Sequence, residues 1–468
     1  MNRKMGMLSS LHCAALSSVG RLCLLWVVFA GSLAHAQTGI REIHAPITIT
    51  NPGSYKLVRN LSHGVTPIVV AASDVTLDLN GFRVVSSGFF PPYGPAIEQQ
   101  PGYRNLTVRN GSLLSADSHG LLALGPGTVV ESVSIYGCQR SAMTLGDGAR
   151  VIGCIVMSNT LSQSSAVIRL GEGGRLENTV AMGNQMTTGS VVSVGSYSHV
   201  DGVVVHDNHF SGVDGVGLTV GPGSRVERVA IHGQTAVAGS FRGLSTQGGT
   251  GQPGTMLAAV SVYSNSAQQT CVGIDAAGPA TLRGVLSSYQ TSTSANPATG
   301  IIVRDNAIVS AALTTHNTGN EGTGLRVEQG ARVTASLATH NSHYGFSGIN
   351  GAWFETCLAV TNGWRGFTLA NNNRVQHSLA AGNGFPAPGG QEGGFRTTGN
   401  GNVIEYNHSW NNWRGVVVNG ANNLVTGNSA LQNASGNYIL SGGNHVGEVL
   451  VQPGPSFSTF NPWINFDL

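Results

Sequence analysis

The chain has 468 residues, of which 66 are glycine and 10% are charged. Ordinary domains average about 7% glycine and about 25% charged residues, so this chain should contain many turns and little charged surface. A net charge of +2 is too small for a strongly basic protein, which argues against a nucleic-acid partner. The hydrophobic content of 41% is too high for a disordered chain.

Residues 1–36 have the pattern of a signal peptide. Basic Arg3 and Lys4 precede an apolar run at 22–30, and Ala34-His-Ala36 is a small-residue cleavage site. We therefore expect an exported protein that begins at Gln37 and resides in the periplasm, at the cell surface or outside the cell. An uncleaved anchor is the alternative, although the run is short for a membrane span. After signal removal we expect no stable membrane span.

A short apolar stretch that ends in asparagine recurs along the chain. Examples are Ile155-Val-Met-Ser-Asn159, Leu337-Ala-Thr-His-Asn341 and Leu358-Ala-Val-Thr-Asn362, and the last two asparagines are 21 residues apart. We assign the recurring position to Cys138, Asn159, Asn184, Asn208, Gln234, Asn265, Gln290, Asn317, Asn341, Asn362, Asn383, Asn411 and Asn433. Such a period identifies a repeat architecture.

The repeat predicts strands rather than helices. Apolar residues alternate with polar ones, and glycines mark the turns, as in Gly324-Leu-Arg-Val327 and Gly366-Phe-Thr-Leu369. Leucine-rich repeats would need a leucine spacing that is absent here, and propellers need periods near about 40. The pattern therefore favours a parallel β-solenoid, in which the recurring asparagines stack as an internal ladder with their amides hydrogen-bonded.

The ladder, the coil length and Asp74-Val-Thr-Leu-Asp-Leu-Asn-Gly81 resemble right-handed parallel β-helix proteins of the pectin-lyase-like superfamily. More narrowly, the chain resembles bacterial secreted β-helix repeat proteins, which often carry segments like Pro52-Gly-Ser-Tyr-Lys-Leu57 and Asn461-Pro-Trp-Ile-Asn-Phe466. The likeness covers about residues 40–468. It implies an all-β, right-handed parallel β-helix, but the superfamily includes lyases, hydrolases, epimerases and noncatalytic scaffolds, so it implies no single activity.

Within this fold we expect three parts after the signal peptide. Residues 37–100 should form an N-terminal cap and the first coils, 101–450 the regular coils, and 451–468 a C-terminal cap. The predicted cap contains four aromatic side chains, which would cover the open edge of the last coil: Phe457, Phe460, Trp463 and Phe466.

Four cysteines follow the signal peptide, without a CxxC motif or a Cys/His cluster that would indicate zinc. We interpret them as buried small hydrophobic side chains, while export would permit a disulfide that the sequence does not assign. They are Cys138, Cys154, Cys271 and Cys357.

Charged residues recur at fixed distances before the ladder. Seven positions before it lie Glu177, Asp201 and Glu227, and nine positions before it lie Arg175, His199 and Arg225. Alternation turns both sets outward, as two adjacent columns of opposite charge that fix strand register. A Ca²⁺ site or a catalytic site at the three carboxylates is the alternative. Histidines also recur one or two positions before the ladder, as the pairs His206 with His232 and His316 with His340.

Aromatic residues follow the ladder in four successive coils of the C-terminal part. Counted from the ladder residue, Tyr344 comes three positions later, and Trp364, Phe385 and Trp413 come two positions later; Arg365 and Arg414 directly follow the tryptophans. Aromatic faces suit sugar rings and arginine suits carboxylates, so this strip is our candidate polysaccharide-binding site. The alternative is that the rings only cover an apolar turn.

The sequence supports an enzymatic function less than it supports glycan binding. Glycoside hydrolysis usually needs two carboxylates at a defined separation, and near the strip we find only Glu355, Glu392 and Glu405. The paired-aspartate motif of polygalacturonases is absent. We therefore predict a glycan-binding protein or surface scaffold without a cofactor, and keep a polysaccharide lyase or glycoside hydrolase, and a purely structural or adhesive solenoid, as alternatives.

Overall fold

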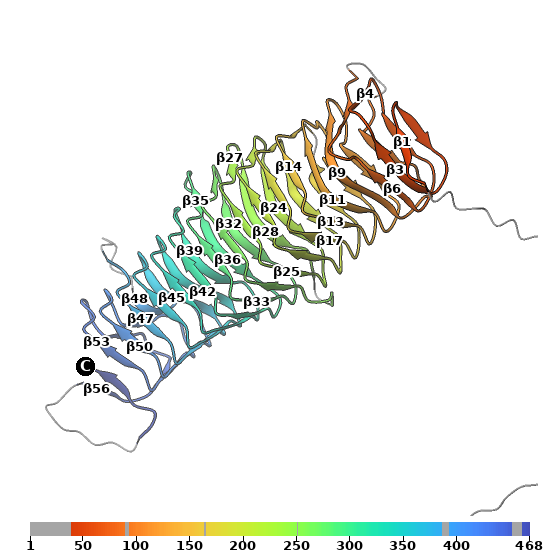
Figure 1. Cartoon of the computed structure of the whole chain (residues 1–468). Coiled ribbons are helices and arrows are strands. Elements are labelled where there is room, and N and C mark those ends of the chain that lie inside the picture. The colour runs from red at the N-terminus through yellow and green to blue at the C-terminus, as the bar shows by residue number, and fades with distance from the viewer. Residues whose placement is uncertain (1–38, 89–92, 163–164, 250, 386–392, 452–460) are drawn as a thin grey trace, which may run out of the picture. The chain divides into compact units, whose positions relative to one another are not determined.

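The computed structural model describes residues 39–88, 93–162, 165–249, 251–385, 393–451 and 461–468. These residues form a parallel β-solenoid of about 16 turns in which no helix occurs (Figure 1). Each strand pairs in parallel with the equivalent strands of neighbouring turns, as from β13 to β17 and β21 on one side of the coil. The predicted all-β solenoid is thereby confirmed.

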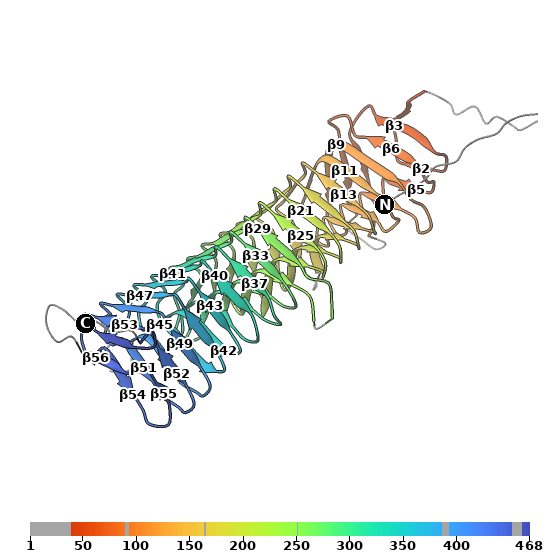
Figure 2. The same cartoon turned by 90° about the horizontal axis from the view of Figure 1, so that it is seen from below.

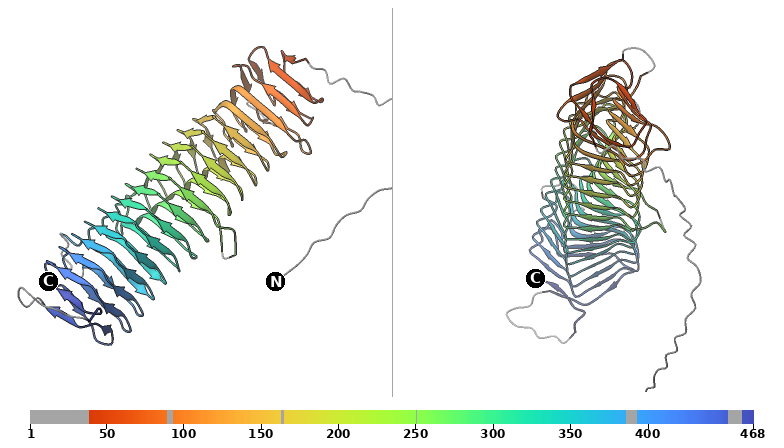
Figure 3. Two further views of the ribbon diagram at one scale, coloured as in Figure 1. Left: turned by 60° about the horizontal axis from the view of Figure 1, so that its bottom comes forward. Right: turned by 45° about the vertical axis from the view of Figure 1, so that its right-hand side comes forward.

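The strands stack into three main faces. Figure 2 and the two views of Figure 3 show the solenoid from further directions. Two faces belong to one continuous sheet, sheet A, because the long strands β9 (Leu106–Ser115) and β11 (Val129–Tyr136) run through both. We call these faces A1 and A2, and the third face is sheet B. Short strands between faces A2 and B form sheet C.

Face A1 consists, besides the first halves of β9 and β11, of β1 (Arg41–Ile43), β3 (Gly53–Leu57), β6 (Val75–Asp78), β13 (Arg150–Ile152), β17 (Arg175–Glu177), β21 (His199–Asp201), β25 (Arg225–Glu227), β29 (Met256–Ala258), β33 (Thr281–Arg283), β37 (Ile308–Ser310), β40 (Arg332–Thr334), β43 (Trp353–Glu355), β46 (Arg374–Gln376), β49 (Val403–Glu405), β52 (Leu424–Thr426) and β55 (His445–Val446). Face A2 consists, besides the second halves of β9 and β11, of β4 (Leu61–His63), β7 (Arg83–Ser86), β14 (Ile155–Met157), β18 (Val180–Met182), β22 (Val204–His206), β26 (Ala230–His232), β30 (Ser261–Tyr263), β34 (Leu286–Ser288), β38 (Leu313–Thr315), β41 (Leu337–Thr339), β44 (Leu358–Val360), β47 (Leu379–Ala381), β50 (His408–Trp410), β53 (Ser429–Leu431) and β57 (Asn465–Asp467).

Sheet B consists of β2 (Ile47–Ile49), β5 (Ile68–Val70), β8 (Ile97–Gln99), β10 (Leu121–Ala123), β12 (Met143–Leu145), β16 (Ser165–Leu170), β20 (Gly189–Val194), β24 (Asp214–Val220), β28 (Ser240–Thr246), β32 (Cys271–Ala276), β36 (Ala298–Val303), β39 (Thr323–Val327), β42 (Tyr344–Asn350), β45 (Arg365–Asn371), β48 (Gly393–Thr397), β51 (Val416–Val418) and β54 (Tyr438–Leu440). Sheet C consists of β15 (Thr160–Leu161), β19 (Gln185–Met186), β23 (His209–Phe210), β27 (Thr235–Ala236), β31 (Ser266–Ala267) and β35 (Thr291–Ser292).

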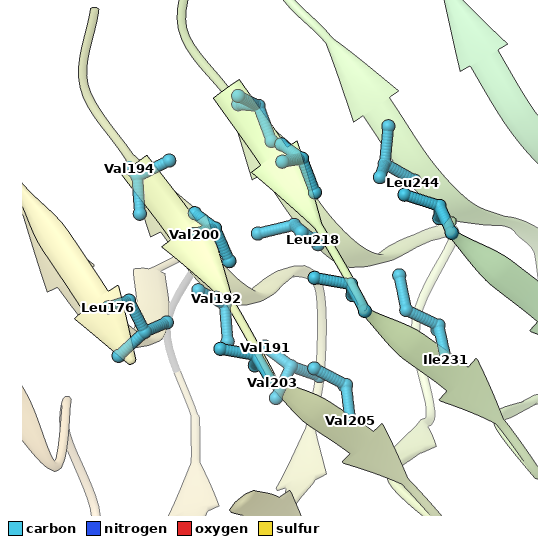
Figure 4. Packing of buried hydrophobic residues seen from close by; sticks show 14 of the residues in the cluster. Leu176, Val191, Val192, Val194, Val200, Val203, Val205, Leu218, Ile231 and Leu244 are labelled. Atoms are coloured by element: carbon cyan, nitrogen blue, oxygen red, sulfur yellow. The ribbon is translucent and has the colours of Figure 1, made fainter. Parts of the chain in front are cut away.

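The core is a continuous apolar column inside the coils. Alternation along each short strand turns one side chain inward per face, so Leu176 of face A1, Val205 of face A2 and Leu218 of sheet B are fully buried together (Figure 4). Towards the C-terminus the column contains phenylalanines: the rings of Phe346 and Phe367 stack with centroids 4.9 Å apart, as do those of Phe367 and Phe395. Burying each such ring contributes about 1.5–3 kcal/mol to folding.

The asparagine ladder lies at the end of face A2 and is buried. Asn362 Nδ2 donates to Asn383 Oδ1 at 3.0 Å, and Asn341 Nδ2 donates to Asn362 Oδ1 at 3.0 Å. At Gln234 the longer side chain donates to the carbonyl oxygens of Val205 and His232 instead. The ladder predicted from the repeat is thus confirmed, with the glutamines as local variants.

One assignment within the ladder was wrong. The ladder residue is Asn412, which accepts from Asn383 Nδ2 at 2.8 Å, and Asn411 precedes it with φ of 50°. The residue before the ladder turns the corner in the left-handed region in other coils too, as at His340 and Thr361. Asparagine tolerates that region better than most residues, so both positions of the Asn-Asn pair accept it and the sequence alone did not separate them.

Two further ladders form in the last coils. One joins Asn373, Asn402, Asn423 and Asn444, and the other joins Asn407, Asn428 and Asn465. Asn465 belongs to β57, which pairs with both β53 and β56 (Val449–Val451) and so brings the end of the chain into the last turn. These additional ladders form hydrogen bonds with backbone N–H and C=O groups at corners where the apolar core offers no hydrogen-bond partner.

The predicted C-terminal cap is described only in part. Phe457 and Phe460 lie outside the described residues, as does the predicted signal peptide. Ile464 is buried, whereas Trp463 is exposed, with its ring 6.4 Å from that of Tyr406. The four cysteines are free thiols and are buried, as predicted, and burial raises the pKa of Cys138, Cys271 and Cys357 to about 12.

Candidate functional site

The outer surface of sheet B carries two columns of polar side chains. Tyr344 and Arg365 are direct neighbours in the first column. The second column lies three positions further along the strands and contains Ser347, Thr368 and Arg396. In earlier coils the same second column contains Ser193, Thr219, Ser245, Asp275 and Arg326. The outer face of sheet B is therefore lined mainly by hydroxyls and arginines.

A hollow of about 580 Å³ lies on this face over β20, β24 and β28. Its polar lining includes Ser190 and Thr219, whose hydroxyl oxygens are 2.6 Å apart, and it extends to Arg242. Arg242 also lines a smaller hollow of about 190 Å³ together with Asp275 and Arg304. The two hollows share this arginine, so they adjoin along the solenoid axis, and hydroxyl lining with a cation at the junction suits a polyhydroxylated ligand.

Beyond the hollows, charged side chains of successive coils form one network. Arg242 Nε lies 3.2 Å from Asp275, Arg304 contacts Asp275 as well, Arg304 Nε lies 2.5 Å from Glu328, and Arg326 Nε lies 3.4 Å from Glu328. Burial opposes the charge on Arg304, but the two carboxylates beside it raise its pKa above the ordinary value. In this network three arginines share two carboxylates, and Asp214 lines the larger hollow together with Arg242.

The predicted aromatic site forms its first cluster at β42 and β45. Tyr344 and Trp364 meet edge to face with ring centroids 6.2 Å apart. The Arg365 guanidinium lies over the Tyr344 ring at 5.2 Å rather than over Trp364, and its Nη1 donates to Thr368 Oγ1 at 3.1 Å. Trp364 is 38% exposed, and it lies beside the hydrogen-bonded side chains of Arg365 and Thr368.

A second, separate cluster contains the remaining predicted residues. Phe385 and Trp413 meet edge to face at 6.0 Å, and Arg414 follows Trp413 in the chain. Since the ladder residue is Asn412, Trp413 comes one position after the ladder, not two. Among the residues described, no ring contact joins this pair to Trp364, so the four predicted rings contact one another as two pairs.

Sequence reasoning missed His343, which is in ring contact with Trp364 at 4.4 Å. Burial lowers the pKa of His343 below its ordinary value of 6.5. The signal was present, because His343 follows Asn341 by two positions as Trp364 follows Asn362. The predicted strip contained only Tyr, Trp and Phe rings, so the histidine at the equivalent position was left out. Arginine over tryptophan does occur, but on face A1, where Arg332 and Arg374 lie on opposite neighbouring turns of Trp353, at 4.4 and 5.3 Å from its ring.

The acidic column predicted on face A1 is present, and each carboxylate is paired. Glu177 contacts Arg150 at 3.2 Å, Glu227 contacts Arg225 at 2.6 Å, and Asp201 contacts Arg228. The arginine hydrogen bonds lower the pKa of Asp201 and Glu227. Across the described ranges, His, Cys, Asp and Glu side chains form no group of three or more that could hold a metal ion. These pairings support the register-fixing lattice over the Ca²⁺ site.

The carboxylates considered for hydrolysis do not meet the aromatic clusters. Glu355 and Glu405 lie on face A1, paired with Arg332 and Arg374, and Glu392 lies outside the described residues. On sheet B the acidic groups of the network, Asp275 and Glu328, are both held by arginines. The geometry therefore supplies positive charge, hydroxyls and aromatic faces on sheet B.

The histidine pairs predicted from the repeat are confirmed as stacks. The rings of His206 and His232 lie 5.2 Å apart and those of His316 and His340 lie 4.9 Å apart, each pair nearly parallel. In the described segments there is no helix long and apolar enough to cross a membrane. Comparison of the chain with models of known protein families and with curated protein sequences gives no match.

Proposed function

We propose that the chain is an exported glycan-binding β-solenoid, related to the bacterial secreted members of the pectin-lyase-like superfamily, that holds an extended glycan on the outer face of sheet B. The signal-peptide pattern of residues 1–36 supports export. The resemblance of the repeat to that of the superfamily supports the proposed relationship. The lining of sheet B supports the ligand class. Strand spacing of about 4.8 Å is close to the length of one sugar unit, so successive coils offer equivalent contacts to successive units.

The observation that carries this proposal is the cluster around Trp364. An exposed indole, a guanidinium fixed by Thr368 and the edge of Tyr344 come from two adjoining coils. A sugar ring stacks on the indole while its hydroxyl or carboxylate reaches Arg365. The guanidinium of Arg365 favours a glycan that carries carboxylate groups.

A lyase or hydrolase is the second class that the resemblance offers. It would use Asp214, which lines the larger hollow, or Asp275 and Glu328 of the network beside it. Asp275 and Glu328 are engaged with arginines. Asp214 alone does not supply the two carboxylates that glycoside hydrolysis usually needs, which favours binding without cleavage.

The test is a binding screen of the secreted protein against uronic-acid-containing and neutral glycans, with product analysis for cleavage. We expect Trp364→Ala and Arg365→Gln each to weaken binding by about tenfold, the loss of about 1.4 kcal/mol that such contacts contribute. Trp463→Ala is the matched control, because Trp463 is 54% exposed but lies just before β57, outside sheet B and outside the strands β9 to β53 of face A2. Binding that is unchanged in both test variants would reject the site, and shortened glycan products would replace the binding function by an enzymatic one.

A further inference from the structure

Face A2 differs from the other faces in lacking charge. From β9 to β53 its fourteen strands present two outward columns, and neither contains Asp, Glu, Lys or Arg. The first column contains Ser112, Ser134, Ile155, Val180, Val204, Ala230, Ser261, Leu286, Leu313, Leu337, Leu358, Leu379, His408 and Ser429. The second contains Leu114, Tyr136, Met157, Met182, His206, His232, Tyr263, Ser288, Thr315, Thr339, Val360, Ala381, Trp410 and Leu431.

The neighbouring face A1 shows that this absence is not a property of the whole chain. In the same coils its outward positions carry arginines and carboxylates in ion pairs, such as Arg150 with Glu177 and Arg332 with Glu355. On face A2 aliphatic side chains stand in the equivalent positions, with Ile155 at 39% and Leu358 at 42% exposed. Long contiguous apolar surfaces on exported or soluble proteins mark interaction sites.

We propose that face A2 binds a second copy of this chain, in antiparallel orientation, with the two-fold axis between β30 and β34. The first argument is area. Fourteen strands at about 4.8 Å spacing extend for about 62 Å, and two outward columns are about 12 Å wide, so each copy would bury about 740 Å². A stable interface buries about 800 Å² per partner, so the face has the size that a dimer needs.

The second argument is the distribution of side-chain size. In the first column small residues precede the axis and leucines follow it: Val204 and Ala230 lie before it, Leu313 and Leu337 after it. In the second column the order is reversed. There the stacked rings of His206, His232 and Tyr263 precede the axis, and Ser288, Thr315 and Thr339 follow it.

Next to the axis, antiparallel pairing therefore places a larger side chain opposite a smaller one in both columns. Further out the match is looser, because Ile155 faces Leu379, Tyr136 faces Trp410 and Leu114 faces Leu431. The first column pairs Ser261 with Leu286, Ala230 with Leu313, Val204 with Leu337, Val180 with Leu358 and Ile155 with Leu379. The second pairs Tyr263 with Ser288, His232 with Thr315, His206 with Thr339, Met182 with Val360 and Met157 with Ala381. In the coils next to the axis, large side chains of each copy then pack into the spaces over small side chains of the other, as a two-fold interface requires.

The corners that flank the face are nearly uncharged as well. Along one border the described corner residues include Gly183, Asp207, Gly233 and Thr361, and along the other they include Gly202, Arg228 and Ala335. Among these corner residues the charged side chains are Asp207, which is hydrogen-bonded to His206, and Arg228, which is paired with Asp201 of face A1.

Sedimentation of the secreted protein tests this proposal. We expect a dimer that persists at high salt, because the interface lacks ion pairs. Leu337→Glu, which places a charge opposite Val204 of the other copy, should weaken the dimer at least tenfold. Ile308→Glu is the matched control, since Ile308 is 54% exposed on face A1, and it should leave the dimer intact.

A cysteine-mixing experiment tests the register. A chain with Ala230→Cys mixed with a chain with Leu313→Cys should form disulfide-linked dimers under oxidation, whereas either chain alone should not. The two positions are three coils apart within one chain, about 14 Å, which is too far for an internal disulfide. The native thiols are buried and do not compete.

A monomer at concentrations up to about 100 µM would overturn the proposal. So would a dimer that survives Leu337→Glu, or a monomer that binds lipid vesicles through face A2. A binding screen of Leu337→Glu with short oligosaccharides keeps the two proposals apart. The site on sheet B is on another face, so the affinity for one short glycan does not depend on the dimer.

Discussion

Removing one rung from the middle of the asparagine ladder tests what stabilises this solenoid. The side chain of Asn362 makes four hydrogen bonds: its oxygen accepts from the backbone N and from Nδ2 of Asn341, at 3.1 and 3.0 Å, and its Nδ2 donates to Ala338 O and Asn383 Oδ1, both at 3.0 Å. Asn362→Ala removes all four. At about 1 kcal/mol for each bond, the free energy of unfolding should fall by about 4 kcal/mol.

The control is Asn444→Ala, at the exposed end of the second ladder. Its oxygen also accepts from the backbone N and Nδ2 of Asn423, at 3.0 and 2.9 Å. Water reaches this end and replaces the lost bonds, so the expected loss is below about 1.5 kcal/mol. Urea unfolding followed by circular dichroism measures both variants, and amide exchange in the coil of Asn341 shows whether the effect is local.

If Asn362→Ala and Asn444→Ala lose equal stability, burial of the ladder does not set its contribution and the reasoning fails. An increase in stability for Asn362→Ala would mean that desolvation of the amides outweighs their hydrogen bonds. Either result would assign the cohesion of the coils to the apolar core alone.

Three further predictions concern groups in the core and at its edge. Burial lowers the pKa of three histidines below 6.5: His119, His232 and His343. The unfolded chain therefore binds protons more tightly than the folded protein, and thermal unfolding should show that stability falls as the pH drops below 6.5. Stability that does not change between pH 7.5 and 5 would contradict this prediction. The four thiols should resist alkylation in the folded protein and react fully in denaturant, as measured by mass spectrometry, because burial raises their pKa and excludes reagent. Phe367→Ala, in the middle of the phenylalanine stack, should cost about 3–5 kcal/mol in urea unfolding, whereas Phe385→Ala, at an exposed ring, should cost far less.

The proposed glycan site and the proposed dimer face use different surfaces of one repeat. Each coil contributes to the outer side of sheet B and to face A2, so a dimer through face A2 leaves both sheet B surfaces accessible. Two glycan sites on one dimer would then bind a polymeric glycan more tightly than an oligomer of the same chemistry.

The amino-acid sequence by itself determined the repeat, the strand class and most of the ladder. These follow from local rules: period-two alternation, glycine at corners, and an amide that is stable in the core only when it stacks on another. The same rules located the charged columns of face A1 and the histidine stacks, because the residues of a column are determined by the register of the repeat alone. They failed at Asn411 and Asn412, where two adjacent asparagines satisfy both the corner and the ladder.

The tertiary structure decided what the register leaves open. It divided the aromatic row into the Tyr344–Trp364 and Phe385–Trp413 pairs, since ring contact depends on the conformation of each turn, and it placed Arg365 over Tyr344. It brought together Arg242, Asp275 and Arg304 from successive coils beside the hollows of sheet B, residues at different offsets from the ladder that no single column contains. It also showed that Glu355 and Glu405 lie on another face. The repeat period determines which residues are neighbours along the solenoid axis. The bends between strands determine which columns of side chains lie on the same surface.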